Sequence, residues 1–263
     1  MARNDYRAEK AFLTQERIKK LELELPPFVT DYIRSIITST GALTRLVYCY
    51  DYRIFFRFLS TEHRSFAGLP LSEYTPALMN ELTVSDLDRY VEYLTYYVKV
   101  SEDSEDDSAP FFLSNENQSI ARKLSSLRGL FKYLEDHNLI SENVLAKVNM
   151  PKVLRKEVIF LEKQEIERFF NVVNTGEGLS PRQQTYVKSF RTRDIAIMAL
   201  LLGTGIRESE MVALDVDDID METQSFLVYR KGGKEQIIYF NDQVRDLLLD
   251  YLRQQYPGFY FVS

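Results

Sequence analysis

The feature that most constrains the fold is a long apolar run interrupted by two glycines. Residues 194–202 are almost wholly apolar and rich in good helix formers, which predicts a buried helix. Gly203 and Gly205 follow this run, and glycine is the residue that most often ends a helix. A second helix is predicted to begin at about Ile206 or Arg207.

Arg207 is a cation at the predicted start of that second helix. A helix N-terminus carries partial positive charge and favours anions, so an arginine there is unfavourable unless an anion is bound. A phosphate held between the guanidinium group and free backbone N–H groups would satisfy both the arginine and the helix end. The sequence therefore predicts an anion site at Arg207.

A short β-hairpin is predicted after this site. Residues 224–229 and 235–240 are β-prone, and residues 230–234 between them read Arg-Lys-Gly-Gly-Lys, a glycine-centred turn. Three cations therefore gather at one hairpin tip. Considered alone, such a turn is typical of a solvated basic loop.

The resemblance to a known family rests on the order of several motifs. They are Arg193-Asp194, residues 202–210 (Leu-Gly-Thr-Gly-Ile-Arg-Glu-Ser-Glu), Leu214-Asp215, Asp218-Ile219-Asp220 and residues 231–235 (Lys-Gly-Gly-Lys-Glu). This order resembles the first half of the catalytic domain of the tyrosine recombinases, the phage integrase family. Within that family it is most similar to the Xer type, and the amino-terminal half resembles the XerS-like recombinases.

The resemblance implies a mainly α fold in two parts. We expect a helical core-binding (SAM-like) domain followed by an α+β catalytic domain with a small β-hairpin or sheet, truncated at its carboxy-terminal side. The expected divisions are a loosely attached charged leader at 1–26, the core-binding DNA-binding domain at 27–148, a linker at 149–160 and the first half of the catalytic domain at 161–263.

The resemblance also implies the chemistry. Tyrosine recombinases cut DNA by attack of a tyrosine on a phosphodiester, leaving a 3′-phosphotyrosyl bond and a free 5′-hydroxyl group, without a metal or cofactor. Arg207 matches the first of two phosphate-clamping arginines, and Lys231 matches the lysine that protonates the leaving oxygen. Glu210 is expected to orient Arg207, and Lys234 to hold a backbone phosphate.

The family's other catalytic groups are a His-x-x-Arg segment, a further His or Trp, and a nucleophilic tyrosine near the end of the domain. None of the 17 tyrosines of this chain stands in the family's sequence context. We therefore expect either a fragment of a longer recombinase or a natural truncation.

The helix predicted at 119–135 is the strongest DNA-binding candidate of the amino-terminal half. A narrow stripe on one side is apolar: Ile120, Leu124, Leu127, Phe131 and Leu134. The other side carries Arg122, Ser125, Arg128, Gly129 and Lys132, with Lys123 on its flank. Residues 117–134 contain no acid although the protein has 39, which favours contact with phosphates over an ordinary solvated face. The small Ser and Gly residues would also permit close approach.

A second basic strip lies on the helix predicted at 43–59. Arg45, Cys49, Arg53 and Arg57 recur every four residues. By itself this strip is typical of a solvated face, and the resemblance makes Arg53 and Arg57 candidates for DNA contact. Cys49 is expected to be a small buried hydrophobe. In the linker, Lys152 is a further candidate for a backbone phosphate contact.

The remaining segments are predicted as follows. Residues 28–38 form a helix, residues 62–82 a loop, and residues 87–98 a helix capped by Thr83 or Ser85. Five of the six residues 102–107 are acidic, which predicts a flexible loop turned away from DNA. Residues 162–170 form a helix and residues 175–192 are loop-like.

Composition limits the possible partners and compartments. The net charge of −6 excludes a uniformly basic DNA-binding surface, so contact with DNA must come from local patches. One cysteine excludes an internal disulfide and fits a reducing compartment. The sequence shows no membrane-length apolar run and no signal-like start, and its two histidines stand alone. We therefore expect a cytoplasmic protein without a metal.

The function expected from the resemblance is site-specific recombination of double-stranded DNA. An Xer-like enzyme would convert chromosome dimers to monomers at cell division, as a homotetramer on two sites and with an FtsK-type DNA translocase as partner. Two alternatives remain open: a truncated, non-catalytic DNA-binding remnant, and a phage or transposon integrase.

Overall fold

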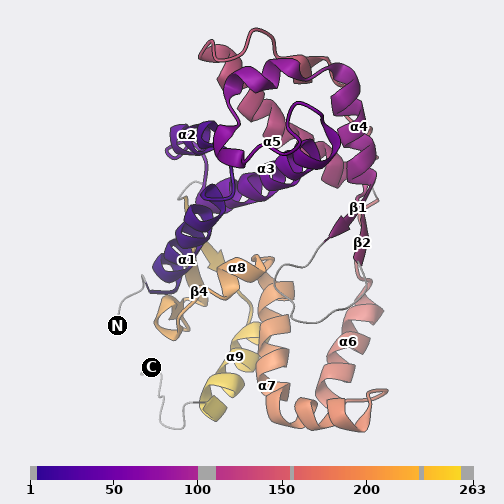
Figure 1. Ribbon diagram of the computed structural model, residues 1–263. Coiled ribbons are helices and arrows are strands. Elements are labelled where there is room, and N and C mark those ends of the chain that lie inside the picture. Colours follow the sequence, from indigo (N-terminus) through magenta and orange to yellow (C-terminus); the bar gives the residue numbers. More distant parts are fainter. Residues whose placement is uncertain (1–4, 100–110, 155–156, 231–233, 256–263) are drawn as a thin grey trace. The chain divides into compact units, whose positions relative to one another are not determined.

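The structure is a computed structural model that describes residues 5–99, 111–154, 157–230 and 234–255. It divides into two compact units, each with its own hydrophobic core (Figure 1). The first unit is Arg7–Lys156, and the second begins at Glu157.

The described part of the first unit is built mainly from helices. They are α1 (Asp5–Glu22), α2 (Pro27–Ser35), α3 (Ala42–Glu62), α4 (Val84–Thr95) and α5 (Asn117–Asp136), with short 3-10 helices η1 (Leu71–Glu73), η2 (Pro76–Glu81) and η3 (Val144–Lys147). Helix α3 packs against α5, and α4 packs against both. Two 3-10 helices therefore lie within the segment predicted as a loop at 62–82.

Aromatic side chains from α3 join these helices. The ring of Phe55 meets the rings of Tyr90 in α4 and Phe131 in α5 edge to face, at centroid distances of 5.0 and 6.3 Å. Each such pair contributes about 0.5–1.5 kcal/mol beyond the apolar area it buries. The predicted apolar stripe of α5 is confirmed, since all five of its residues are buried.

The prediction of a loosely attached leader at residues 1–26 is wrong for its described side chains. Ile18, Leu21 and Leu25 are buried in the same core as the side chains of α3. Ile18 and Leu21 are three residues apart and so lie on one face of α1, and Leu25 follows in the turn after the helix. The helix-prone character of this segment agrees with α1, and its many charges obscured the few apolar side chains through which it packs.

Helix α4 has Thr83 as its cap, one of the two predicted residues, but spans Val84–Thr95 where 87–98 was predicted. Thr83 and Asp86 form a capping box, in which the Asp86 N–H donates to Thr83 Oγ1 (3.3 Å) and the Thr83 N–H donates to Asp86 Oδ2 (2.9 Å). The chain leaves the helix after Thr95 and forms β1 (Tyr96–Lys99), which pairs antiparallel with β2 (Phe111–Ser114). The predicted acidic loop at 102–107 lies outside the described residues.

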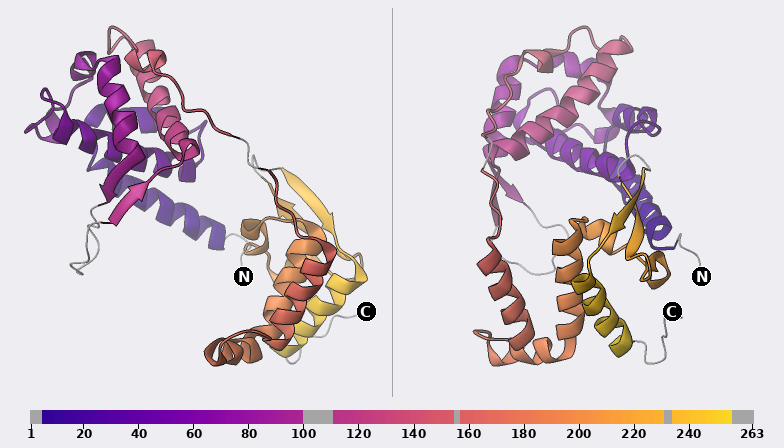
Figure 2. Two further views of the ribbon diagram at one scale, coloured as in Figure 1. Left: turned by 90° about the vertical axis from the view of Figure 1, so that its right-hand side faces the viewer. Right: turned by 180° about the vertical axis from the view of Figure 1, so that it is seen from behind.

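The second unit combines helices with a small antiparallel sheet. Its described elements are α6 (Lys163–Thr175), α7 (Pro181–Thr204), α8 (Glu208–Met211), η4 (Val216–Asp218), β3 (Ile219–Asp220), β4 (Ser225–Tyr229), β5 (Glu235–Tyr239) and α9 (Asp242–Gln255). Helix α7 lies between α6 and α9, and the strand order is β3-β4-β5 (Figure 2). The expected class, mainly α with a small sheet, is confirmed.

The predicted hairpin is present as β4 and β5. Tyr229 pairs with Glu235, and the Arg230 N–H donates to the Lys234 carbonyl oxygen at 2.8 Å. Phe226 and Val228 of β4 point into the core, as the alternation of a half-buried strand requires. Residues 231–233 of the turn, and with them Lys231, lie outside the described residues.

Residues 175–192 are not the predicted loop, because α7 already begins at Pro181. Ser180 caps the helix: its Oγ accepts from the Gln183 N–H (3.4 Å), and the Ser180 N–H donates to Gln183 Oε1 (3.0 Å). A capping serine, a proline in the first turn and a glutamine three residues after the cap form a helix-start signal. That signal is present in the sequence, although glycines and a proline in the segment favour a loop.

The two glycines after the apolar run have different tasks. Gly203 lies inside α7, where a β-carbon would come within 2.6 Å of Val244 Cγ2 in α9, so the two helices approach closely there. Gly205 ends α7 in the left-handed region with φ of 65°, and its N–H donates to the Leu201 carbonyl oxygen at 2.9 Å. Glycine adopts this conformation without the steric penalty of other residues.

Gly203→Ala should lower the free energy of unfolding by about 1–2 kcal/mol although alanine is the better helix former, because its methyl group overpacks the contact with Val244. Urea denaturation followed by circular dichroism measures this change. In a Val244→Ala background the same substitution should be neutral or stabilising. A stabilising effect in both backgrounds would contradict a close approach of α7 and α9.

Candidate nucleic-acid interface and phosphate site

Arg207 stands at the surface end of the turn that follows α7. Gly205 ends α7, Ile206 is buried in the core, and Arg207 is the N-cap residue of α8. The Arg207 side chain is 64% exposed, whereas that of Glu210 is only 6% exposed. The turn therefore presents a cation to solvent directly above a buried carboxylate.

Glu210 binds Arg207 with both of its carboxylate oxygens. Arg207 Nη1 donates to Glu210 Oε1 at 2.8 Å, and the Arg207 N–H donates to Glu210 Oε2 at 3.0 Å. The bond from the Arg207 N–H is the largest cause of the lowered pKa of Glu210, with burial opposing and the Arg207 side chain adding to it. The carboxylate therefore stays ionised and restricts the orientation of the guanidinium group.

The dipole argument that first indicated an anion at Arg207 is wrong in its details. Helix α8 has only 4 residues, so few aligned peptide dipoles stand behind Arg207. The Arg207 N–H is also not free, because it donates to Glu210. The exposed guanidinium group is what remains available to an anion.

The hairpin contributes a second cation to the surroundings of Glu210. The charge of Arg230, the residue directly after β4, also lowers the pKa of Glu210. Arg230 Nε is buried and has no hydrogen-bond partner among the described residues. Lys234 is exposed, and Lys231 lies outside the described residues. Arg230 was counted among the basic residues of the turn but was not predicted as a site residue.

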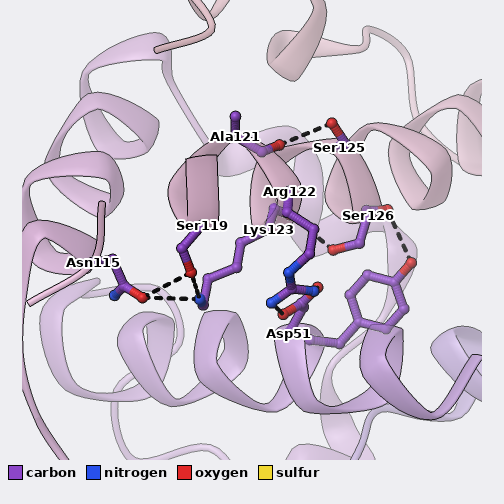
Figure 3. Close-up of polar contacts among 9 residues, drawn as sticks. Asp51, Asn115, Ser119, Ala121, Arg122, Lys123, Ser125 and Ser126 are labelled. Atoms are coloured by element: carbon purple, nitrogen blue, oxygen red, sulfur yellow. Dashed lines mark hydrogen bonds and ion pairs between the residues drawn. The ribbon is translucent and has the colours of Figure 1, made fainter. Parts of the chain in front are cut away.

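In the first unit, Arg122 is bound by a buried aspartate from another helix (Figure 3). Its Nη1 and Nη2 donate to Asp51 Oδ2 and Oδ1 of α3 at 2.7 and 2.9 Å. The Asp51 side chain is 2% exposed, while that of Arg122 is 46% exposed. Burial raises the pKa of Asp51, and the opposing effect of Arg122 does not cancel that rise.

Arg128 and Lys132 share the exposed side of α5 with Arg122. The three positions fall within an arc of about 120° on a helix of 3.6 residues per turn. Arg128 Nη2 donates to the Val148 carbonyl oxygen at 2.8 Å, and Lys132 pairs with Asp136 at 3.2 Å. Three of the predicted DNA-binding residues are thus brought together on one face.

Lys123 is a correction to the predicted DNA-binding set. It is buried, and its Nζ donates to Asn115 Oδ1 at 3.1 Å and to Ser119 Oγ at 2.9 Å (Figure 3). Burial also lowers the pKa of this ammonium group. Gly129 is a second correction, because a β-carbon there would meet the Tyr32 hydroxyl group, so its small size serves packing within the protein.

The basic strip of α3 is not one solvated face. Arg45 and Cys49 are buried, and burial raises the pKa of the Cys49 thiol to about 12, so its prediction as a core residue is confirmed. Arg57 is exposed, and Arg53 Nη1 donates to Glu24 at 3.0 Å.

The structure does not bring Arg53 and Arg57 together with Arg122. Asp51, which faces Arg122, is separated around α3 by about 160° from Arg53 and by about 120° from Arg57, so neither arginine lies on the side of α3 that meets Arg122. Lys152 lies nearer to α5, because its carbonyl oxygen accepts from Asn117 Nδ2 at 2.9 Å, and its side chain is exposed.

None of the described helices combines the length and apolar character needed to span a lipid bilayer. Within the same residues, no three His, Cys, Asp or Glu side chains are grouped so that they could hold a metal ion.

Comparison with known proteins identifies the class. Residues 159–262 match the phage integrase family. The Tn1549 transposon integrase, whose structure was solved in complex with transposon right end DNA, has a similar fold, with a TM-score of 0.52 at 16% identity over 89% of this chain and 66% of that one. The second unit is therefore a domain of the phage integrase family, and over most of its length the chain is similar to tyrosine recombinases.

Within that family the similarity is to Xer recombinases. The chain is 27% identical to the tyrosine recombinase XerC of Caldanaerobacter subterraneus subsp. tengcongensis, over 88% of this chain and 60% of that one. It is 29% identical to the tyrosine recombinase XerS of Streptococcus agalactiae, over 92% of this chain and 71% of that one. It thus spans less than two thirds of the XerC relative.

Glu210→Gln should lower the free energy of unfolding at pH 7 by about 1 kcal/mol, because the amide loses the charge-assisted bonds to Arg207. The pKa of Glu210 is lower in the folded protein than in the unfolded chain. The ionised carboxylate therefore stabilises the fold fully above the unfolded-state pKa of about 4.3, and this stabilisation is lost as the pH falls through the folded-state pKa. Urea denaturation at a series of pH values measures the difference in the free energy of unfolding between this variant and the wild type.

The matched control for that experiment is Glu208→Gln, an exposed neighbour in the same turn. It should change stability by less than about 0.5 kcal/mol. A Glu210→Gln effect that does not shrink toward low pH would contradict an ionised carboxylate bound to Arg207.

Proposed function

We propose that this chain is the DNA-binding and phosphate-contacting part of a site-specific tyrosine recombinase of the Xer kind. The observation that carries the proposal is the exposed Arg207, held by the buried Glu210 at the end of a glycine-terminated helix and beside the basic hairpin. A guanidinium group fixed in this way is suited to bind a phosphodiester with two parallel hydrogen bonds.

In the reaction a tyrosine oxygen forms a bond to phosphorus while the bond from phosphorus to the 5′-oxygen breaks. Negative charge accumulates on the non-bridging oxygens, and Arg207 stabilises that charge. Lys231 donates a proton to the departing 5′-oxygen, and Glu210 keeps the Arg207 guanidinium group in place. Lys234 holds a neighbouring backbone phosphate.

The α5 face is the main DNA-binding surface of the first unit in this proposal. Arg122, Arg128 and Lys132 contact backbone phosphates, and Lys152 extends the surface from the segment beside the first turn of α5. Arg53 and Arg57 form a separate surface on α3. Contacts of this kind set the position of the protein on DNA without selecting a sequence.

The cellular role follows from the Xer relatives. We assign to the complete enzyme the conversion of chromosome dimers to monomers, as a homotetramer on two duplex sites in the cytoplasm and with an FtsK-type translocase. The fold shared with a transposon integrase supports integration of a mobile element as the second candidate.

Replacing Arg122, Arg128 and Lys132 together by Ala should weaken binding to duplex DNA of any sequence. The slope of log K against log salt should flatten by about 0.9 for each phosphate that the variant no longer neutralises, and so by up to about 2.7. Fluorescence anisotropy at several salt concentrations measures the slope.

The charge-matched control replaces Lys19, Arg34 and Arg89, which pair with acids on α1, α2 and α4. Its slope should stay close to that of the wild type. Equal slopes for the wild type, the α5-face variant and the control variant would show that the α5 face does not contact DNA. A wild type that does not bind duplex DNA would contradict the proposed function.

Incubated with a half-site DNA that traps cleavage, the 263-residue chain should bind without forming a covalent adduct. It contains no His-x-x-Arg sequence, and groups that act as one catalytic unit are strongly non-additive. Denaturing electrophoresis is the measurement. A surviving protein–DNA band that maps to Tyr251, Tyr256 or Tyr260 would show that the nucleophile lies within these residues.

A further inference from the structure

The ion pair between Arg122 and Asp51 is unusual because its two members have opposite surroundings. Asp51 belongs to α3 and is buried, with its two oxygens bound by the two Nη atoms of Arg122. Arg122 reaches this carboxylate from the exposed side of α5, and nearly half of its side chain remains in solvent. Figure 3 shows the guanidinium group lying directly against the carboxylate.

This ion pair is not required to hold α3 against α5. The two helices are already joined by the rings of Phe55 and Phe131 and by the Tyr52 hydroxyl group, which donates to the Ser126 carbonyl oxygen at 2.9 Å. A buried ion pair is also a weak source of stability, because desolvation of the charges offsets their attraction. The raised pKa of Asp51 agrees with this, because the attraction of Arg122 does not fully offset the cost of burying the carboxylate charge.

What the pair does provide is a fixed guanidinium group at the surface. An arginine side chain has many rotamers, and two parallel bonds to a buried carboxylate select one of them. Asp51 takes two of the five N–H donors of the group, so the others remain for a ligand. Lys132 of the same face contrasts with this, because both it and its partner Asp136 are exposed.

We propose that Asp51 is a positioning residue that orients the Arg122 guanidinium group for a backbone phosphate of duplex DNA. The inference rests on the proposed DNA binding by the α5 face. A phosphate that meets an arginine already in place does not have to order its side chain, so affinity rises through preorganisation. Asp51 itself does not touch the DNA.

The test uses Asp51→Asn in the full chain, with binding to a short fluorescein-labelled duplex measured by anisotropy. Simple electrostatics predicts tighter binding, because a negative charge near the DNA is removed. Positioning predicts the opposite sign: affinity should fall by about three- to tenfold, and the salt slope should flatten by up to about 0.9, because Arg122 no longer neutralises its phosphate.

Asp136→Asn is the matched control, since it makes the same chemical change beside Lys132, on the helix that carries Arg122. Binding by this variant should be unchanged or tighter. In an Arg122→Ala background, Asp51→Asn should not weaken binding further, because the side chain that it positions is gone. If Asp51→Asn acted only by reducing the amount of folded protein, it would lower the apparent affinity in the wild-type and Arg122→Ala backgrounds alike and leave the salt slope unchanged. Circular dichroism measures the folded fraction independently.

The outcomes separate the two proposals. If the wild type binds and Arg122→Ala weakens binding while Asp51→Asn strengthens it or leaves it unchanged, the positioning role is overturned and DNA binding stands. An additive effect of the two substitutions also overturns positioning. If the wild type does not bind duplex DNA, both proposals fail.

Discussion

The close approach of α7 to α9 at Gly203 is the contact on which the second unit depends. Because no side chain separates the helices there, Val244 packs directly onto the α7 backbone, and the last turn of α7 is held against the core. Gly205 then turns the chain in a conformation that other residues adopt only with strain, and Ile206 anchors it. Arg207 is presented at the surface as a result of these two glycines.

Each unit fixes an exposed arginine with a buried carboxylate. In the second unit Glu210 lies three residues after Arg207, so a single helical turn brings the two together. In the first unit Asp51 and Arg122 are distant in sequence and meet only because α3 packs against α5. A guanidinium group restrained in this way keeps its charge in solvent and most of its donors free, which suits recognition of phosphate oxygens.

Elements with strong local signals could be predicted from the sequence. The apolar stripe of α5, the glycine end of α7, the hairpin of β4 and β5 and the cap at Thr83 depend on residues close together in the chain, so spacing and residue type were sufficient to predict them. The helix start at Ser180 and the packing stripe of α1 were equally local and were obscured by a proline and by many charges.

Which charged groups meet could not be predicted, because it depends on how the helices and strands pack. The pairing of Asp51 with Arg122 depends on how α3 packs against α5. Lys123 lies about 100° around α5 from Arg122, and that rotation carries it to the buried side, where Asn115 and Ser119 accept its hydrogen bonds. The action of Arg230 on Glu210 likewise depends on where the sheet places the end of β4. Electrostatic interactions and burial depend on spatial distances between residues that are far apart in the sequence, and these distances cannot be predicted from local sequence patterns.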